Sequence, residues 1–361
     1  MDVISNYFPD FKVGDLVEES IRRELGNGLP LAKAELSLRL TYLQRLTLEF
    51  LATEEARKDP AQTRIMQLRA LRGKEQFKLY EKLEKKSIEN DESPTFDSRY
   101  YYQAYQRFEE ADQFQNQKAQ YNKPELIIEK QKMLNAFFLS EKIKDACELI
   151  QRARVLKKED FERLDDFGMK EIQKNSEAYD QYPPLALYNA IYQMLLIDNV
   201  ETFANANSVL QNYKQNLSKP DLVNGFNFLL NFCIKKVNEG DRSWLSTSFS
   251  LYKQMLENGL LEIDGILPEW HYKNLATNGL LLKETNWVFN FIHDYKGSLN
   301  PEIAENAFAY NLAALYHQRG EYEKVLPLLL QVEYKDWRYS LNAKVLLLKT
   351  YYDMDEEEAL L

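Results

Sequence analysis

The feature that most constrains this chain is the spacing of its prolines. Between Pro30 and Pro301 the intervals are 30, 34, 30, 59, 36, 48 and 33 residues, with Pro183 and Pro184 taken as one break. Proline disrupts the interior of a helix but suits its first turn. Glycine and proline together make up only about 6% of the 361 residues, against roughly 12% in an average protein. The pattern therefore predicts an all-α protein made of helical blocks of regular size.

Several of these blocks have predictable starts. Asp59-Pro60, Ser93-Pro94 and Asn300-Pro301 each place an N-cap side chain directly before a proline at the first helical position. Asp198 with Glu201 has the spacing of a capping box. We therefore expect helices to begin at these four places.

The N-terminal half predicts longer elements. Residues 30–59 and 60–90 each have room for one long helix, because no proline interrupts them internally. Residues 124–156 predict a compact hairpin that turns at Ser140. The Pro183-Pro184 break marks the one domain boundary that the sequence indicates.

The C-terminal half contains an internal repeat. One predicted helix carries Leu312 and Tyr316, and a turn follows at Gly320. At an offset of 35 residues the same positions hold, in order, Leu347, Tyr351 and Asp355. Asp198 stands where Gly320 does, earlier in the chain. A helical repeat of this length is typical of stacked hairpins, each of which is stable only against its neighbours.

These offsets resemble the tetratricopeptide pattern of about 34 residues. The resemblance covers residues 183–361, with larger side chains such as Val325 at close-packing positions and one unit, residues 220–267, stretched to 48 residues. It implies a right-handed α-solenoid of degenerate hairpins. Residues 1–182 are then expected to form a long-helix bundle or a widened start of the solenoid. The chain is also similar to bacterial helical-repeat proteins of this class, which implies no particular function.

Four asparagines are the candidate ligand-binding residues. They lie on corresponding first helices, at separations of 38, 47 and 37 residues: Asn189, Asn227, Asn274 and Asn311. In tetratricopeptide domains an asparagine before the first-helix leucine faces the concave groove, and Asn274 and Asn311 precede leucines. An amide offers two donors and an acceptor, which suits the main chain of a peptide. The resemblance thus implies a peptide, helix or partner subunit held on a concave surface.

A second resemblance implies a different ligand. Phe226-Asn227, Gly240 and residues 251–260 are similar to a pentatricopeptide unit, and that family binds single-stranded RNA. Residues 180–361, however, contain 15 Lys and Arg against 23 Asp and Glu, and an acidic groove repels phosphates. We therefore expect a protein or peptide partner, with RNA binding as the alternative.

Two clusters in the N-terminal half are candidates for partner docking. One is a basic stripe with helical spacing, and the other is a set of aromatic residues on one helix face. They comprise Lys74, Lys78 and Lys82, and Tyr101, Tyr105 and Phe108. Charged stripes are usually solvated faces and aromatic stripes are usually core, whereas exposed aromatic rings bind partners well.

Recognisable catalytic chemistry is missing from the sequence. The three histidines are 22 and 24 residues apart, so none has the spacing of a helical metal site. The two cysteines, Cys147 and Cys233, form no disulfide framework, and neither has a nucleophile motif. We expect no cofactor, no metal and no enzymatic activity. An enzyme with a carboxylate site between repeats is a third hypothesis.

The sequence also predicts the cellular compartment of the protein and an uncovered C-terminal end of the helical array. The longest unbroken apolar run is five residues, 312–316, so no membrane helix is expected, and a reducing, cytoplasmic compartment fits the cysteine content. No basic residue precedes Lys12, which is unlike a signal peptide. The last predicted helix stops after six residues at Leu361. We expect further repeats there, or a partner that covers this end.

Overall fold

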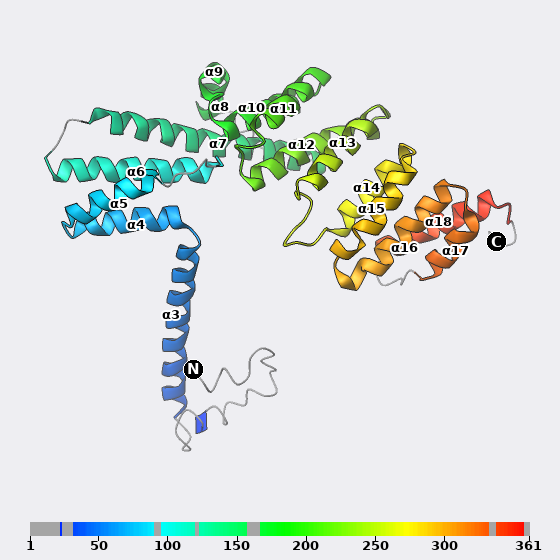
Figure 1. Ribbon diagram of the computed structural model, residues 1–361, viewed down its shortest axis with the longest axis horizontal. Coiled ribbons are helices and arrows are strands. Elements are labelled where there is room, and N and C mark those ends of the chain that lie inside the picture. The colour runs from blue at the N-terminus through cyan, green and yellow to red at the C-terminus, as the bar shows by residue number, and fades with distance from the viewer. Residues whose placement is uncertain are drawn as a thin grey trace. The chain divides into compact units, whose positions relative to one another are not determined.

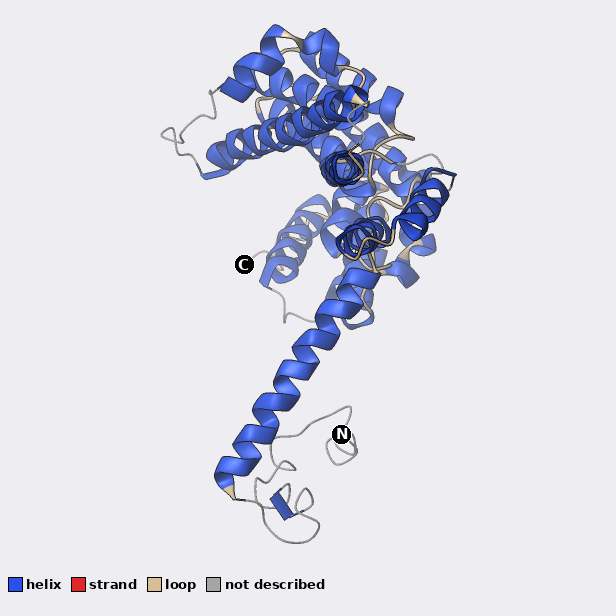
Figure 2. Cartoon of the chain, turned by 90° about the vertical axis from the view of Figure 1, so that its left-hand side faces the viewer, coloured by secondary structure: helices blue, strands red, loops and turns tan. Residues whose placement is uncertain are grey.

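A computed structural model describes residues 22–23, 32–89, 95–119, 123–156, 167–331 and 337–356, which are almost wholly helical (Figures 1 and 2). The predicted all-α class is confirmed, because those residues contain no strand beyond two isolated bridges. The helices are α3 (Lys33–Arg57), α4 (Pro60–Gly73), α5 (Phe77–Glu89), α6 (Ser98–Gln117), α7 (Pro124–Leu156), α8 (Phe167–Lys174), α9 (Ser176–Tyr179), α10 (Pro183–Ile197), α11 (Val200–Tyr213), α12 (Lys219–Asn238), α13 (Trp244–Glu257), α14 (Glu269–Leu281), α15 (Thr285–Asp294), the 3-10 turn η1 (Lys296–Ser298), α16 (Pro301–Gln318), α17 (Tyr322–Gln331) and α18 (Trp337–Asp353).

The chain divides into two compact units. The first comprises residues 1–91 and 106–127, and the second comprises residues 92–105 and 128–361. The boundary predicted at Pro183 falls within the second unit.

In the first unit a buried ion pair joins α4 to α6. The Glu110 carboxylate is 2% exposed and accepts two hydrogen bonds from the Arg72 guanidinium. Beside it Tyr80 of α5 stacks on Phe114 of α6, with ring centroids 3.9 Å apart. The Asp59 side chain accepts from the Gln62 amide at 3.0 Å, so the predicted start at Asp59-Pro60 is confirmed.

Two predictions for the N-terminal half are wrong. Residues 60–90 form two helices, because the chain turns after Gly73 with Glu75 in a left-handed conformation at φ 56°. Residues 124–156 form the single helix α7, with Ser140 buried in its middle. Serine alone does not stop a helix, since its helix propensity is only moderately unfavourable, whereas glycine is the least favourable residue in a helix after proline. Ser93-Pro94 lies outside the described residues.

The second unit contains consecutive helical hairpins. α10 pairs with α11, α12 with α13, α14 with α15, and α16 with α17, and each hairpin contacts the next (Figure 1). The predicted helix start at Asn300-Pro301 is confirmed, because the Asn300 side chain accepts from the Glu302 amide at 3.0 Å. A continuous apolar core runs through these hairpins and includes Ile143 and Cys147 of α7.

The hairpin turns repeat one backbone conformation. We call α10, α12, α14 and α16 the first helices, because each begins a hairpin. A residue with positive φ follows each of them and also α18; these residues are Asp198, Gly240, Lys283, Gly320 and Asp355. At the last four, two backbone hydrogen bonds recur, as in Gly320 N to His317 O (3.0 Å) and Glu321 N to Tyr316 O (2.9 Å). This is the Schellman motif. Asp198, Gly320 and Asp355, which the sequence pattern sets in corresponding positions, all adopt a left-handed conformation.

A buried carboxylate ties three helices of this unit together. Asp221 of α12 is 2% exposed, and its Oδ1 accepts from Tyr188 Oη of α10 at 2.7 Å and from Lys144 Nζ of α7 at 3.0 Å. Its Oδ2 accepts from Ser218 Oγ, the α12 N-cap, at 2.9 Å. A buried charge is tolerated only when it is paired and hydrogen-bonded. These partners therefore fix where α7 and α10 stand relative to the start of α12.

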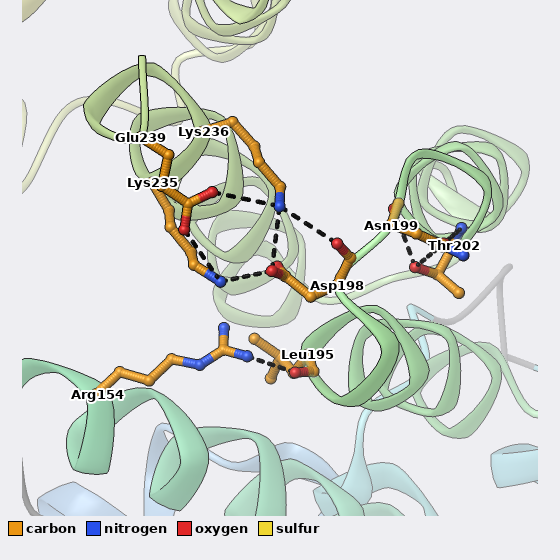
Figure 3. Close-up of polar contacts among 8 residues, drawn as sticks. All are labelled: Arg154, Leu195, Asp198, Asn199, Thr202, Lys235, Lys236 and Glu239. Atoms are coloured by element: carbon orange, nitrogen blue, oxygen red, sulfur yellow. Dashed lines mark hydrogen bonds and ion pairs between the residues drawn. The ribbon is translucent and has the colours of Figure 1, made fainter. Parts of the chain in front are cut away.

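A second polar cluster holds the α10–α11 turn (Figure 3). Asp198 Oδ2 accepts from Lys235 Nζ at 2.6 Å and from Lys236 Nζ at 3.1 Å. Burial raises the pKa of Asp198, but the lysine hydrogen bonds outweigh burial and leave that pKa below its ordinary value of 3.8. The capping box predicted for Asp198 is wrong, because Asn199 is the N-cap and accepts from Thr202 N at 2.9 Å. Asp198 instead ends α10.

Replacing Asp221 with alanine should destabilise the second unit by about 3 to 5 kcal/mol, because Lys144 would lose its counter-charge and the Tyr188 hydroxyl its acceptor. Urea unfolding followed by circular dichroism measures this loss. Asp145→Ala, at an exposed carboxylate of α7, is the matched control and should change stability by less than about 0.5 kcal/mol. Equal effects of the two variants would contradict the role given to Asp221.

Asp198→Asn should cost about 1 to 2 kcal/mol at neutral pH, because it removes the charge-assisted bonds while asparagine also tolerates the left-handed conformation. Since the folded pKa of Asp198 is lowered, its contribution is present above pH 3.8 and is lost as pH falls through the folded pKa. The difference in unfolding free energy between wild type and variant should therefore shrink below pH 4. A difference that stays constant from pH 7 to pH 3 would show that the charge contributes nothing.

Candidate functional site

The candidate site is a pocket of about 340 Å³ in the second unit. Its walls come from α7, α12, α13 and α14, and polar residues make up most of its lining. The lining residues are Glu148, Gln151, Asn224, Asn227, Phe228, Leu230, Asn231, Ile234, Tyr252, Trp270, His271 and Asn274. We call it the amide pocket, because five of these side chains are carboxamides.

The pocket lies where two successive hairpins pack less closely than the others. α10 packs on α12, α14 on α16, and α16 on α18, but α12 and α14 lack a comparable close backbone contact in this part of the chain. The connection between their hairpins, residues 258–268, is long and contains a tight turn closed by reciprocal backbone bonds between Ile263 and Ile266. This connection is the stretch in the unit of 48 residues noted in the sequence. The pocket therefore opens where α12 and α14 lack a close contact.

Three asparagines line one face of α12. Asn224, Asn227 and Asn231 are spaced by three and four residues, which places them on successive turns of the same side. Asn231 stands nine residues before the left-handed Gly240. Asn189, Asn274 and Asn311 stand equally far before Asp198, Lys283 and Gly320. Asn231 is therefore the true register equivalent on α12, and Asn227 lies one turn earlier.

Two of the pocket amides are oriented by buried tyrosines. Asn224 Nδ2 donates to Tyr188 Oη at 3.5 Å, and Asn274 Nδ2 donates to Tyr252 Oη at 3.4 Å. Because Tyr188 donates in turn to Asp221, the buried carboxylate network sets the orientation of Asn224. With their nitrogens engaged, both amides keep oxygens that can accept from a ligand.

The pocket contains one histidine and one exposed indole. His271 Nδ1 is buried and has no hydrogen-bond partner, and burial lowers the pKa of His271 below 6.5, so the ring is neutral at pH 7. Its ring centroid lies 5.8 Å from that of Trp270, which is 50% exposed. A half-exposed tryptophan leaves a large apolar face in contact with water, as is common at binding sites.

The charge of the lining is negative. Glu148 is its carboxylate, and the lining contains neither lysine nor arginine. The partner of Glu148 is Arg152, one turn along α7 at 3.6 Å, with a side chain 70% exposed. A pair this exposed contributes little, so the carboxylate is accessible to a competing cation.

The four predicted asparagines have different surroundings. Asn227 and Asn274 both line the amide pocket. Asn189 is half-buried, and its Oδ1 has no hydrogen-bond partner. Asn311 is 1% exposed, and its Nδ2 donates to Ala307 O at 2.7 Å, so it is inaccessible to a groove ligand and is corrected to a core residue. Its helix packs against α18 as well as α14, whereas Asn274 borders the place where α12 and α14 lack a close contact.

The predicted docking residues do not form one site. Tyr101 is 2% exposed and contacts Tyr182 at 5.5 Å between ring centroids, so it belongs to the core, not to a docking surface. Tyr105 and Phe108 are half-buried. Lys74, Lys78 and Lys82 are exposed, but Lys74 precedes α5 in the turn after α4, so the stripe is interrupted.

Sequence reasoning missed Asn224, Asn231, Trp270 and the role of His271. The signal that locates Asn231 is its distance from the left-handed turn, not its distance from Asn189. For the connection that opens the pocket, the sequence showed only that this stretch is longer than its counterparts. How the connection changes the packing of α12 and α14 can be seen only in the tertiary structure.

Outside the pocket, the described residues offer little further chemistry. Cys147 and Cys233 are buried, and burial raises the pKa of both thiols, in the case of Cys233 to about 12. Among those same residues no three His, Cys, Asp or Glu side chains gather as metal ligands would. None of the described helices combines the length and apolar character that crossing a bilayer requires.

Comparisons with known proteins give no relative. No known protein family, curated protein or solved structure matches this chain significantly.

The imidazole of His271 should titrate with a midpoint below 6.5, which NMR of the folded protein can measure. In concentrated denaturant the same histidine should return to about 6.5. Since the folded pKa is lowered, the free energy of unfolding should fall as pH drops from 6.5 through that pKa, and His271→Gln should lack this portion of the fall. A midpoint at or above 6.5 would contradict the burial of the ring.

Proposed function

We propose that this chain is a non-enzymatic protein-binding scaffold that holds an extended peptide segment of a partner in the amide pocket. The proposal includes a right-handed, tetratricopeptide-like solenoid of the hairpins α10 to α17, in which the first helices line the concave face. The supporting observation is that the amides of α12 and α14, from adjacent first helices, meet in one pocket with Trp270 beside them.

The chemistry of the pocket favours a peptide over other ligands. A peptide in extended conformation presents alternating N–H and C=O groups, and carboxamides pair with either. Trp270 supplies apolar contact area to an adjacent side chain. The lining has a carboxylate and no cation, which disfavours nucleic acid, because phosphate binding requires neutralising charge. The pentatricopeptide-like alternative therefore lacks support at this site.

The test is selection of random linear peptides on the full-length protein, followed by affinity measurement for the enriched sequences. The double variant Asn227→Ala with Asn231→Ala should weaken them about tenfold or more, because each lost hydrogen bond contributes about 0.5 to 1.5 kcal/mol. The matched control is Asn205→Ala with Asn212→Ala, two exposed asparagines of α11 outside the pocket, which should leave affinity unchanged.

Two outcomes would overturn the proposal. One is a selection that enriches no peptide, or peptides that both double variants bind equally well. The other is tight binding of random single-stranded RNA that weakens steeply with salt, which would favour the pentatricopeptide-like alternative.

A further inference from the structure

We infer that the amide pocket is selective for the guanidinium group of an arginine side chain in the bound peptide, with Glu148 as its counter-ion and Trp270 as its stacking surface. This inference rests on the proposed function and adds the chemical class of the residue that the pocket recognises.

The first argument is electrostatic. The carboxylate of Glu148 is the charge in the lining at neutral pH, because His271 is neutral there and lysine and arginine are absent from the walls. A charge at a partly desolvated concave surface acts more strongly than one on an open surface, because less water screens it. The exposed pair with Arg152 at 3.6 Å is readily exchanged for a ligand cation.

The second argument comes from the aromatic wall. Trp270 is half-exposed at the pocket, and tryptophan is the best aromatic partner for a cation. Arginine is favoured over lysine here, since the planar guanidinium stacks on an indole and is more weakly hydrated than an ammonium.

The third argument is the supply of acceptors. A guanidinium has five N–H donors and no acceptor. Asn224 and Asn274 engage their nitrogens with tyrosine hydroxyls, so their oxygens are the atoms that each amide offers. Together with the two oxygens of Glu148, the pocket therefore offers acceptors for a fork of donors, which a single ammonium would use only in part.

The fourth argument is the apolar part of the lining. Ile234 is 40% exposed and lines the pocket together with Leu230 and Phe228. The methylene stem of an arginine packs on such side chains while its charged head reaches polar atoms. The volume of about 340 Å³ lies at the small end of the range for ligand sites, roughly 300 to 1,000 Å³, and suits one long side chain.

The experiment titrates N-acetyl-arginine methylamide into the full-length protein and follows the indole N–H signal of Trp270 by NMR, assigned with Trp270→Phe. The neutral isostere N-acetyl-citrulline methylamide and the lysine analogue are titrated in parallel. The arginine probe should bind about tenfold more tightly than the citrulline probe, and more tightly than the lysine probe.

The matched variants separate charge from fold. Glu148→Gln should weaken the arginine probe about tenfold and leave the citrulline probe unchanged, because only the ionic contact is lost. Asp145→Asn, an exposed carboxylate on the same helix that does not line the pocket, should change neither. Unchanged circular dichroism for both variants confirms that the fold is retained.

The outcomes distinguish this inference from the proposed function. Equal binding of arginine and citrulline probes, no shift of the Trp270 signal, or no effect of Glu148→Gln would overturn the guanidinium assignment. Selected peptides that lack arginine, yet lose affinity with the Asn227 and Asn231 variants, would overturn it while the proposed function stands. Binding of the free arginine probe without enrichment of any peptide would overturn the peptide source, and with it the proposed function.

Discussion

One buried charge fixes the relative positions of three helices in the second unit. Asp221 is almost fully removed from water at the start of α12, and a charge in that position is stable only with partners on every side. Lys144, Tyr188 and Ser218 supply them from α7, α10 and the N-cap of α12. Tyr188 then accepts from Asn224, so the interaction that positions the helices also orients an amide of the pocket. One hydrogen-bond network therefore positions the helices and orients a residue of the candidate site.

Most helices of the second unit are joined by similar short turns, and one connection is longer and irregular. The Schellman turns after α12, α14, α16 and α18 end these four helices with the same pair of backbone hydrogen bonds. The contacts of α10 with α12, α14 with α16 and α16 with α18 cover the faces that meet. The connection at residues 258–268 interrupts that regularity, and the polar face of α12 is accessible as a result.

The amides of the pocket are suited to the loose contact between α12 and α14. Carboxamides suit such a contact, because they are stable both when solvated and when bonded to a ligand. Trp270 and Glu148 each add a specific chemistry to this lining: a flat apolar face and a negative charge. Their presence gives the pocket a preference that amides alone do not supply.

The amino-acid sequence by itself determined the all-helical class and the helix starts at Asp59 and Asn300, because capping and proline act locally. It singled out Asn227 and Asn274, which line the amide pocket, but it did not predict the pocket itself. Tertiary structure alone decided that Asn274 is exposed whereas Asn311, in the same register, is buried. It likewise placed Tyr101 in the core. The physical reason is that a helical register specifies which face a residue occupies, while exposure depends on whether a distant helix packs across that face.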